Sequence, residues 1–268
     1  QGSALAVATA QAAAQASAAA ASAAAASAAP PTPKEKANTV ALNTVLSQHH
    51  KGVQVPLLSR TELGEAFATY IKMVEDEPTP AEEPTDEQMT CFIFAAREFD
   101  STFADFAIWV PHAGRMLKAQ TFNGLLFNSK GELQLTEMFG PCCPEDWALC
   151  FDVYIVPNIM FSIVSEARLR RYKAKILRYA AQYPGCWALI YQMDVRTRKE
   201  HAHRVKRRLM AKAAVALKKG KDPDFDVERP WHEVWLQLIE GERDWWFTEL
   251  ECHLISAKTG AAKLAEYV

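Results

Sequence analysis

Hydrophobic residues return every three or four positions over most of the chain, which is the spacing of amphipathic helices. The first such segment covers about 60–75, and its apolar face comprises Leu63, Phe67, Tyr70, Ile71 and Val74. Ser59 is placed to cap its N-terminus, with Glu62 three residues later as the reciprocal partner. Thr85 repeats this capping pattern ahead of a second segment, 89–99, which is apolar on most sides. The pattern therefore predicts two capped helices, of which the second is buried.

The spacing changes from helical to alternating between residues 121 and 138. Phe122, Leu125 and Phe127 precede the turn-forming sequence Asn128–Gly131, and Leu133 and Leu135 follow it with alternating polar partners. Such alternation around a turn is typical of a β-hairpin, and it is the single β element that the sequence predicts. A short helix is expected just before it, at about 114–119.

Prolines and glycines divide the rest of the chain into further helices. Pro144 suits the first position of a helix, and Pro157 is expected to end it. The later predicted helices are two long ones over 159–183 and 186–219, a tryptophan-rich one that opens at Pro230, and one over about 244–253 beyond Gly241. Four aromatic residues at helical core spacing are expected to be buried: Trp187, Tyr191, Trp231 and Trp235.

The predicted fold class is all-α, mainly helical, with one small β-hairpin. We expect a single helical domain over 58–256, with an acidic loop at 75–85. Residues 1–36 are expected to form a disordered, low-complexity alanine-rich leader and proline linker, and 257–268 a flexible tail. The leader is too weakly apolar to predict a membrane span. A chain that begins with Gln1 is also expected to be a fragment.

Charge is strongly segregated along the chain, although the formal net charge is only −2. Residues 75–87 contain seven acids and no base, whereas residues 196–221 contain eleven bases and one acid. Residues 222–268 return to eleven acids against four bases. Local charge blocks therefore predict more about partners than the whole-chain charge does.

The six cysteines are irregularly spaced, and the chain has no Asn-x-Ser/Thr sequon. Both features favour a reducing, intracellular location, cytoplasmic or nuclear. Cys142, Cys143 and Cys150 lack the spacing of a zinc site, and His201 and His203 should point to different sides of a helix. No metal or cofactor is therefore expected. The vicinal pair Cys142-Cys143 is a candidate for redox reactivity, but nothing near it in the sequence specifies this chemistry.

The most specific physical signal is cationic. Arg168, Arg171, Lys175 and Arg178 recur at spacings that form one line on the first long helix, and Arg204, Arg207, Arg208 and Lys212 cluster on the second. Asp194 and Arg198 of the second helix are four residues apart and are expected to pair. If the tight Pro184-Gly185 connection makes the two helices antiparallel, both cationic sets could share a face that binds a phosphate backbone. The alternative is that these are solvated helix faces balanced by acidic segments elsewhere in the fold.

The sequence contains none of the common nucleotide-binding, hydrolase or metalloprotease motifs. We therefore expect no catalytic residues and no enzymatic activity. An enzyme with a cleft near Trp109–Arg115 is the least favoured alternative.

Four segments together resemble a known family. They are Ala104–Pro111 leading to Arg115; Gly140-Pro141 with Trp147 and Cys150; Cys186–Gln192 with Asp194, Arg196, Arg198 and Glu200; and Arg229–Trp231 with Trp245 or Trp246. Their order and spacing resemble an uncharacterised multicopy protein family of dinoflagellate algae, over roughly residues 60–260. Some members look like the first reading frame of a retroelement, with a Cys/His-rich tail that this sequence lacks. The resemblance implies a Gag-like or accessory role and supplies no catalytic residues.

The leading functional hypothesis is a non-enzymatic, nucleic-acid-associated protein of mobile-element origin. The expected partners are RNA or DNA, bound without sequence preference, and further copies of the chain. Neither a membrane nor a small-molecule substrate is indicated. The competing hypothesis is a helical protein-interaction scaffold whose basic helices meet an acidic partner.

Overall fold

The computed structural model of this protein describes residues 39–111 and 119–265. The leader predicted at 1–36 lies outside the described residues, as does nearly all of the short helix expected at 114–119. The hydrophobic core lies within the compact unit Val40–Val268.

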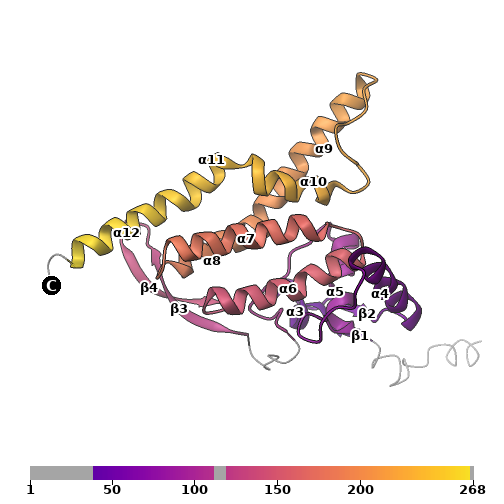
Figure 1. The fold of residues 1–268 in the computed structure, drawn as a ribbon, viewed down its shortest axis with the longest axis horizontal. Helices are drawn as coiled ribbons and strands as arrows, with labels where there is room; N and C mark the ends of the chain where they lie inside the picture. The colour runs from indigo at the N-terminus through magenta and orange to yellow at the C-terminus, as the bar shows by residue number, and fades with distance from the viewer. Residues whose placement is uncertain (1–38, 112–118, 266–268) are drawn as a thin grey trace, which may run out of the picture. The chain divides into compact units, whose positions relative to one another are not determined.

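The described chain is mainly helical, which confirms the predicted fold class (Figure 1). The elements of its first half are β1 (Thr39–Ala41), α3 (Leu42–Val45), β2 (Gln54–Pro56), α4 (Arg60–Val74), α5 (Asp86–Glu98), β3 (Thr121–Phe127) and β4 (Leu133–Phe139). Those of its second half are α6 (Pro144–Met160), α7 (Glu166–Gln182), α8 (Trp187–Arg196), the π-helical turn η2 (Thr197–His201), α9 (Ala202–Lys218), α10 (Pro230–Leu236), η3 (Gln237–Gly241), α11 (Arg243–Trp246), η4 (Phe247–Glu251) and α12 (Cys252–Ala265). β1 pairs with β2, and β3 pairs with β4.

Both predicted capping boxes are present. The Ser59 hydroxyl accepts from the backbone N–H of Glu62, whose carboxylate accepts in return from the Ser59 N–H at 2.8 Å. Thr85 and Gln88 repeat this exchange at the start of α5. The buried face of α5 includes Met89, Cys91 and Phe92, as its apolar pattern predicted.

The core begins earlier in the chain than the domain boundary expected at residue 58. Leu42, Leu46 and Val55 are each at most 1% exposed and belong to the same hydrophobic cluster as α5 and α6. These residues form short elements without a long periodic pattern, so their hydrophobic spacing does not predict them. At the other end, residues expected in a flexible tail continue as helix α12 to Ala265.

Helix α6 corrects the prediction that Pro157 ends a helix. The helix runs through this proline to Met160, and α7 starts only at Glu166 rather than at 159. In the turn that lacks the proline N–H, Asn158 Nδ2 donates to the Tyr154 carbonyl at 2.9 Å. Almost every residue from Cys150 to Met160 is buried. Packing on all sides therefore holds the helix together despite the cost of an internal proline.

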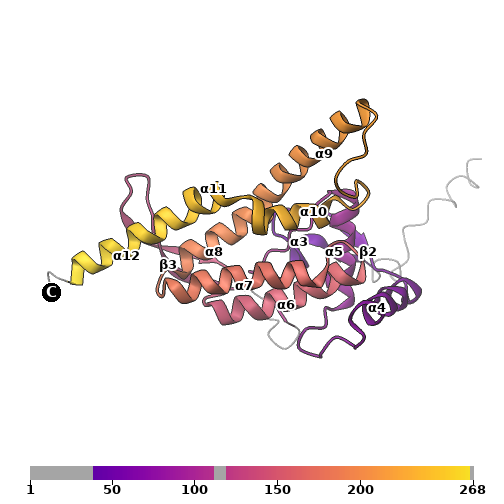
Figure 2. The ribbon, with the colours of Figure 1, turned by 45° about the horizontal axis from the view of Figure 1, so that its top comes forward.

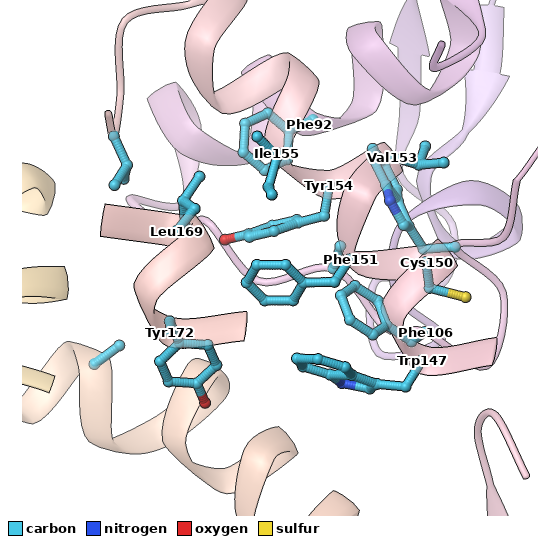
Figure 3. Packing of buried hydrophobic residues seen from close by; sticks show 14 of the residues in the cluster. Phe92, Phe106, Trp147, Cys150, Phe151, Val153, Tyr154, Ile155, Leu169 and Tyr172 are labelled. Atoms are coloured by element: carbon cyan, nitrogen blue, oxygen red, sulfur yellow. The ribbon is translucent and has the colours of Figure 1, made fainter. Parts of the chain in front are cut away.

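Aromatic side chains fill the centre of the fold (Figure 3). Phe106 meets Phe151 edge-to-face at 6.1 Å, and Phe151 stacks on Tyr172 at 5.8 Å between ring centroids. The four aromatic residues predicted to be buried are so, with exposures of 9% or less: Trp187, Tyr191, Trp231 and Trp235.

The predicted hairpin forms with Leu125 opposite Leu135. Its inner face packs on α8, where an added Cβ at Gly124 would lie 2.3 Å from the Cβ of Ala188. Glycine is therefore required for this close approach.

Candidate nucleic-acid interface

The first predicted cationic set lies on α7, and the second lies on α9, which continues from α8 through η2. The turn between α7 and α8 sets the relative direction of these helices. Gly185 in that turn has a φ of +83°, a conformation that glycine adopts without strain. Tyr172 and Asp194, about equally far from the turn, meet through a 3.0 Å hydrogen bond. The two helices therefore run antiparallel side by side, as the tight Pro184-Gly185 connection predicted.

The rotation of α8 is fixed by a buried ion pair. Arg198 donates to Asp194 as the sequence spacing predicted, and Asp194 also accepts from Trp147 Nε1 at 3.0 Å. Arg198 Nη1 reaches across to the carbonyl of Ala104 at 2.7 Å. Since α8, η2 and α9 are continuous, this anchoring also decides which side of α9 faces away from the core.

The cations predicted on α7 do not form a free surface. Arg168 Nη1 donates to the carbonyl of His232, and Arg171 Nη2 pairs with Glu240. Both partners belong to the continuous segment α10–η3, which contacts α7 and α9. The common cationic face expected from the sequence is therefore interrupted, because α10–η3 packs against both helices.

Lys175 contacts both η3 and α11. Its Nζ donates to the carbonyl of Ile239 at 3.0 Å and lies 4.2 Å from the ring centroid of Trp246. Burial lowers the pKa of Lys175 to about 8, against the opposing influence of Glu251. Arg178, the last residue of the predicted line, remains exposed. Contacts with α10–η3 therefore engage Arg168 and Lys175, whereas Arg171, in an exposed ion pair, and Arg178 remain accessible.

Helix α9 is placed differently. Both views show it leaving the body of the unit beyond η2 and standing away from α6, α7 and α8 (Figures 1 and 2). Residues 219–229, which we call the return segment, connect the end of α9 to the start of α10. The buried residues of α9 are confined to one side and include Val205, Leu209 and Ala213.

The opposite side of α9 is cationic. At about 100° per residue, its exposed basic residues fall within an arc of about 140° that does not overlap the buried stripe. These residues are Arg204, Arg207, Arg208, Lys212 and Lys218, which we call the α9 cationic face. Helix α9 contains no acidic residue. The face extends over roughly 21 Å from Arg204 to Lys218, at the helical rise of 1.5 Å per residue.

Few partners inside the protein neutralise this face. Arg208 pairs with Glu242, and Arg204 lies 4.0 Å from Glu200. Within residues 39–111 and 119–265, Arg207, Lys212 and Lys218 form no ion pair. The acids of the return segment, Asp222, Asp224, Asp226 and Glu228, form none with α9 over the same ranges. The groove between this segment and α9 is lined by apolar residues such as Leu209, Ala213 and Phe225. Lys212 at the edge of the face, Asp222 and Asp224 also line it.

Sequence reasoning placed four of its candidates on this helix and omitted the cations at its end. Lys218 lies in the same arc as Arg204, so the helical periodicity used for the first four could have identified it. The contacts between the α7 cations and α10–η3 cannot be identified from helical periodicity, because they join residues more than 60 positions apart.

The two histidines near the face add no charge to it. His201 is buried, stacks on Trp245 at 3.8 Å, and shares a hydrogen bond with Glu242 at 2.8 Å. Burial lowers its pKa, although Glu242 acts in the opposite direction. His203 meets the edge of Trp231, and burial also lowers its pKa. Both imidazoles are therefore held as neutral packing groups at pH 7.

Three of the four segments on which the resemblance rests contact one another in the structure. Ala104 and Trp147 contact the Asp194–Arg198 pair, and Trp187 Nε1 donates to the Pro141 carbonyl at 2.9 Å. These residues are buried and hold elements together.

Comparison with family models, curated proteins and solved structures finds no match for this chain. Over the described residues, no helix combines the length and apolar character needed to cross a membrane.

Proposed function

We propose that this protein is a non-enzymatic, nucleic-acid-associated protein that binds phosphate backbones through the α9 cationic face. The observation that carries the proposal is a projecting helix with five exposed basic residues on one side and no acid along its length. Neutralising successive phosphates releases condensed counterions, which supplies affinity without base contacts.

The chemistry of the face favours binding without sequence preference. The other residues in its arc are Ala211 and Val215, so the face offers no aromatic ring on which a base could stack. Long basic side chains on a convex helix contact phosphates, whereas sequence is read by groups that reach base edges. We therefore assign the face a positioning and retention role on RNA or DNA.

The wider biological context belongs to the same proposal. A mobile-element origin and a Gag-like or accessory role rest on the four-segment resemblance. An intracellular location, cytoplasmic or nuclear, is supported by the fact that all six cysteines are unpaired.

The test is fluorescence anisotropy with a labelled single-stranded RNA of mixed sequence, over a series of salt concentrations. Wild type should bind with a log–log salt slope of about 3 to 4 in magnitude if the whole face is engaged. The variant Arg204→Gln/Arg207→Gln/Lys212→Gln/Lys218→Gln should lose most of that slope. Replacing Asp222 and Asp224 by Asn should strengthen binding, because these carboxylates repel phosphates near the rim of the face.

A matched control separates the face from net charge. Lys51, Arg60, Lys72 and Lys130 are exposed and lie outside α9, so their replacement by Gln removes the same four charges. This control should bind like wild type. Equal weakening of both quadruple variants, or binding of an acidic polypeptide in preference to RNA, would refute the proposal.

A further inference from the structure

Two adjacent cysteines and a carboxylate converge at the start of α6. Cys142 Sγ donates to Asp146 Oδ2 at 3.3 Å, and Cys143 Sγ accepts from the backbone N–H of Asp146 at 3.5 Å. The two sulfur atoms and an Asp146 oxygen all lie within 4.8 Å of one another. The sequence indicated no metal site, because the spacing of the cysteines alone does not reveal that one helical turn adds this carboxylate.

The backbone holds this cluster in place from both sides. Pro141 is buried, and its carbonyl accepts from Trp187 Nε1. Pro144 occupies the first turn of α6, with Cys143 as the N-cap residue. Pro144 restricts the backbone of Cys143, which precedes it, and the buried Pro141 anchors the chain immediately before Cys142. The thiol groups are therefore presented at the surface in a defined arrangement.

We propose that Cys142, Cys143 and Asp146 bind one thiophilic divalent cation, of which Zn²⁺ is the representative. Two thiolates and one carboxylate are the donor types that Zn²⁺ takes, and three protein ligands leave a fourth position for water or another ligand. Zinc–sulfur bonds of about 2.3 Å in a tetrahedron require donor atoms somewhat closer than 4.8 Å. Side-chain rotation supplies this contraction, because Cys142 is exposed and Cys143 is half-buried.

Charge and hydrogen bonding are compatible with this occupant. Two thiolates and a carboxylate carry three negative charges, which a divalent cation largely neutralises. Burial raises the pKa of the Cys143 thiol to about 11 and the Asp146 N–H acts in the opposite direction, so the cation has to displace the thiol protons as it binds.

A disulfide between the two cysteines is the competing use of the same atoms. Adjacent Cα atoms across a trans peptide are about 3.8 Å apart, shorter than the 4.4–6.8 Å usual for disulfides. The chain contains no cis peptide bond among its described residues, so the pair would have to strain to close. Cys150 is not a ligand, because it is buried in the core at 1% exposure. Metal binding is thus the less strained chemistry for this pair.

The experiment is a titration of the reduced protein with Co²⁺, followed by displacement with Zn²⁺. Wild type should show thiolate-to-cobalt charge-transfer absorption that saturates at one equivalent and disappears on addition of Zn²⁺. Cys142→Ser and Cys143→Ser should each weaken Co²⁺ binding at least tenfold, and Asp146→Asn should weaken it about tenfold. Bound Zn²⁺ should also protect two thiols from alkylation.

The matched control is Cys186→Ser/Cys252→Ser, which removes two half-buried thiols that are not part of the cluster. It should retain wild-type Co²⁺ affinity. Far-UV circular dichroism would verify that each variant is folded, which is expected because Cys142 and Cys143 are not in the core. Absence of the charge-transfer band in wild type, or its persistence in Cys142→Ser/Cys143→Ser, would overturn the proposal.

Discussion

The guanidinium of Arg198 donates to both carboxylate oxygens of Asp194, at 2.8–3.1 Å, and the two side chains are 1% and 0% exposed. Trp147 and Tyr172 donate to the same carboxylate, and Phe106 lies 3.9 Å below the guanidinium carbon. The pair therefore joins α6, α7, α8 and the segment before the hairpin at one point. Its hydrogen bonds are directional, so it specifies how these elements are rotated against one another.

Breaking this pair should be far more costly than breaking an exposed one. Arg198→Met leaves the Asp194 carboxylate buried without its counter-charge, and we expect a loss of about 3–5 kcal/mol in the free energy of unfolding. Arg196→Met is the control, because Arg196 pairs with Glu249 in partial contact with solvent and should cost less than about 1 kcal/mol. Urea denaturation measures both. Similar losses for the two variants would contradict the assigned role of the buried pair.

Gly140 should be intolerant of a side chain for two reasons that can be separated. Its φ is +145°, and an added Cβ would lie 2.2 Å from the ring of Tyr191. Gly140→Ala should therefore destabilise the protein by about 3 kcal/mol or more, through backbone strain and overpacking together.

Gly131 provides the comparison, since its φ is +80° but nothing lies within 4 Å of an added Cβ. Gly131→Ala should cost only about 1 kcal/mol, from backbone strain alone. Thermal unfolding of the two variants would show the difference, and equal losses would exclude the close approach to Tyr191 as the cause.

Trp187 is expected to stabilise the fold mainly through packing. It stacks on Tyr191, meets the edge of Trp147, and is 9% exposed. Trp187→Ala should cost about 3–5 kcal/mol as a large-to-small change in the core. Trp187→Phe keeps an aromatic ring but loses the hydrogen bond to Pro141, and should cost clearly less. If Phe proves as damaging as Ala in chemical denaturation, the hydrogen bond rather than the packing is the main contribution.

Lys175 should make stability depend on pH in the alkaline range. Its pKa is lowered from an ordinary 10.5 to about 8 in the folded protein, chiefly by burial. Between about pH 8 and 10.5 the unfolded chain therefore holds a proton that the folded chain has released, so stability from this group rises with pH. Below pH 8 both states are protonated, and the folded state bears the cost of a half-buried charge.

The variant Lys175→Met removes this titration. Between pH 8 and 10.5, the free energy of unfolding of wild type should rise by about 1–2 kcal/mol relative to that of the variant. This value allows for screening of a partly exposed amine. Urea denaturation of both proteins at several pH values gives this difference, in which the other titrating groups cancel. A difference that stays constant with pH would show that the amine is not buried as described.

Several elements could be predicted from the sequence because they depend on interactions between residues close together in the chain. The capping boxes at Ser59 and Thr85 involve residues three positions apart, and the hairpin at Asn128–Gly131 depends on a turn and its flanking alternation. Asp194 and Arg198 are one helical turn apart, so their pairing followed from helical geometry. In each case the interacting groups are neighbours in the chain, and the helical or strand period alone fixes their relation.

Tertiary packing decided what those periods leave open. Helix α6 continues past Pro157 because it is buried on all sides, although the helix propensity of proline predicts that the helix ends there. The partners of the α7 cations lie more than 60 residues away in α10–η3, so the sequence showed a basic stripe but not what covers it. Whether a charged face binds a partner or stabilises the fold depends on which helix packs against it, and the period of a single helix contains no information about that neighbour.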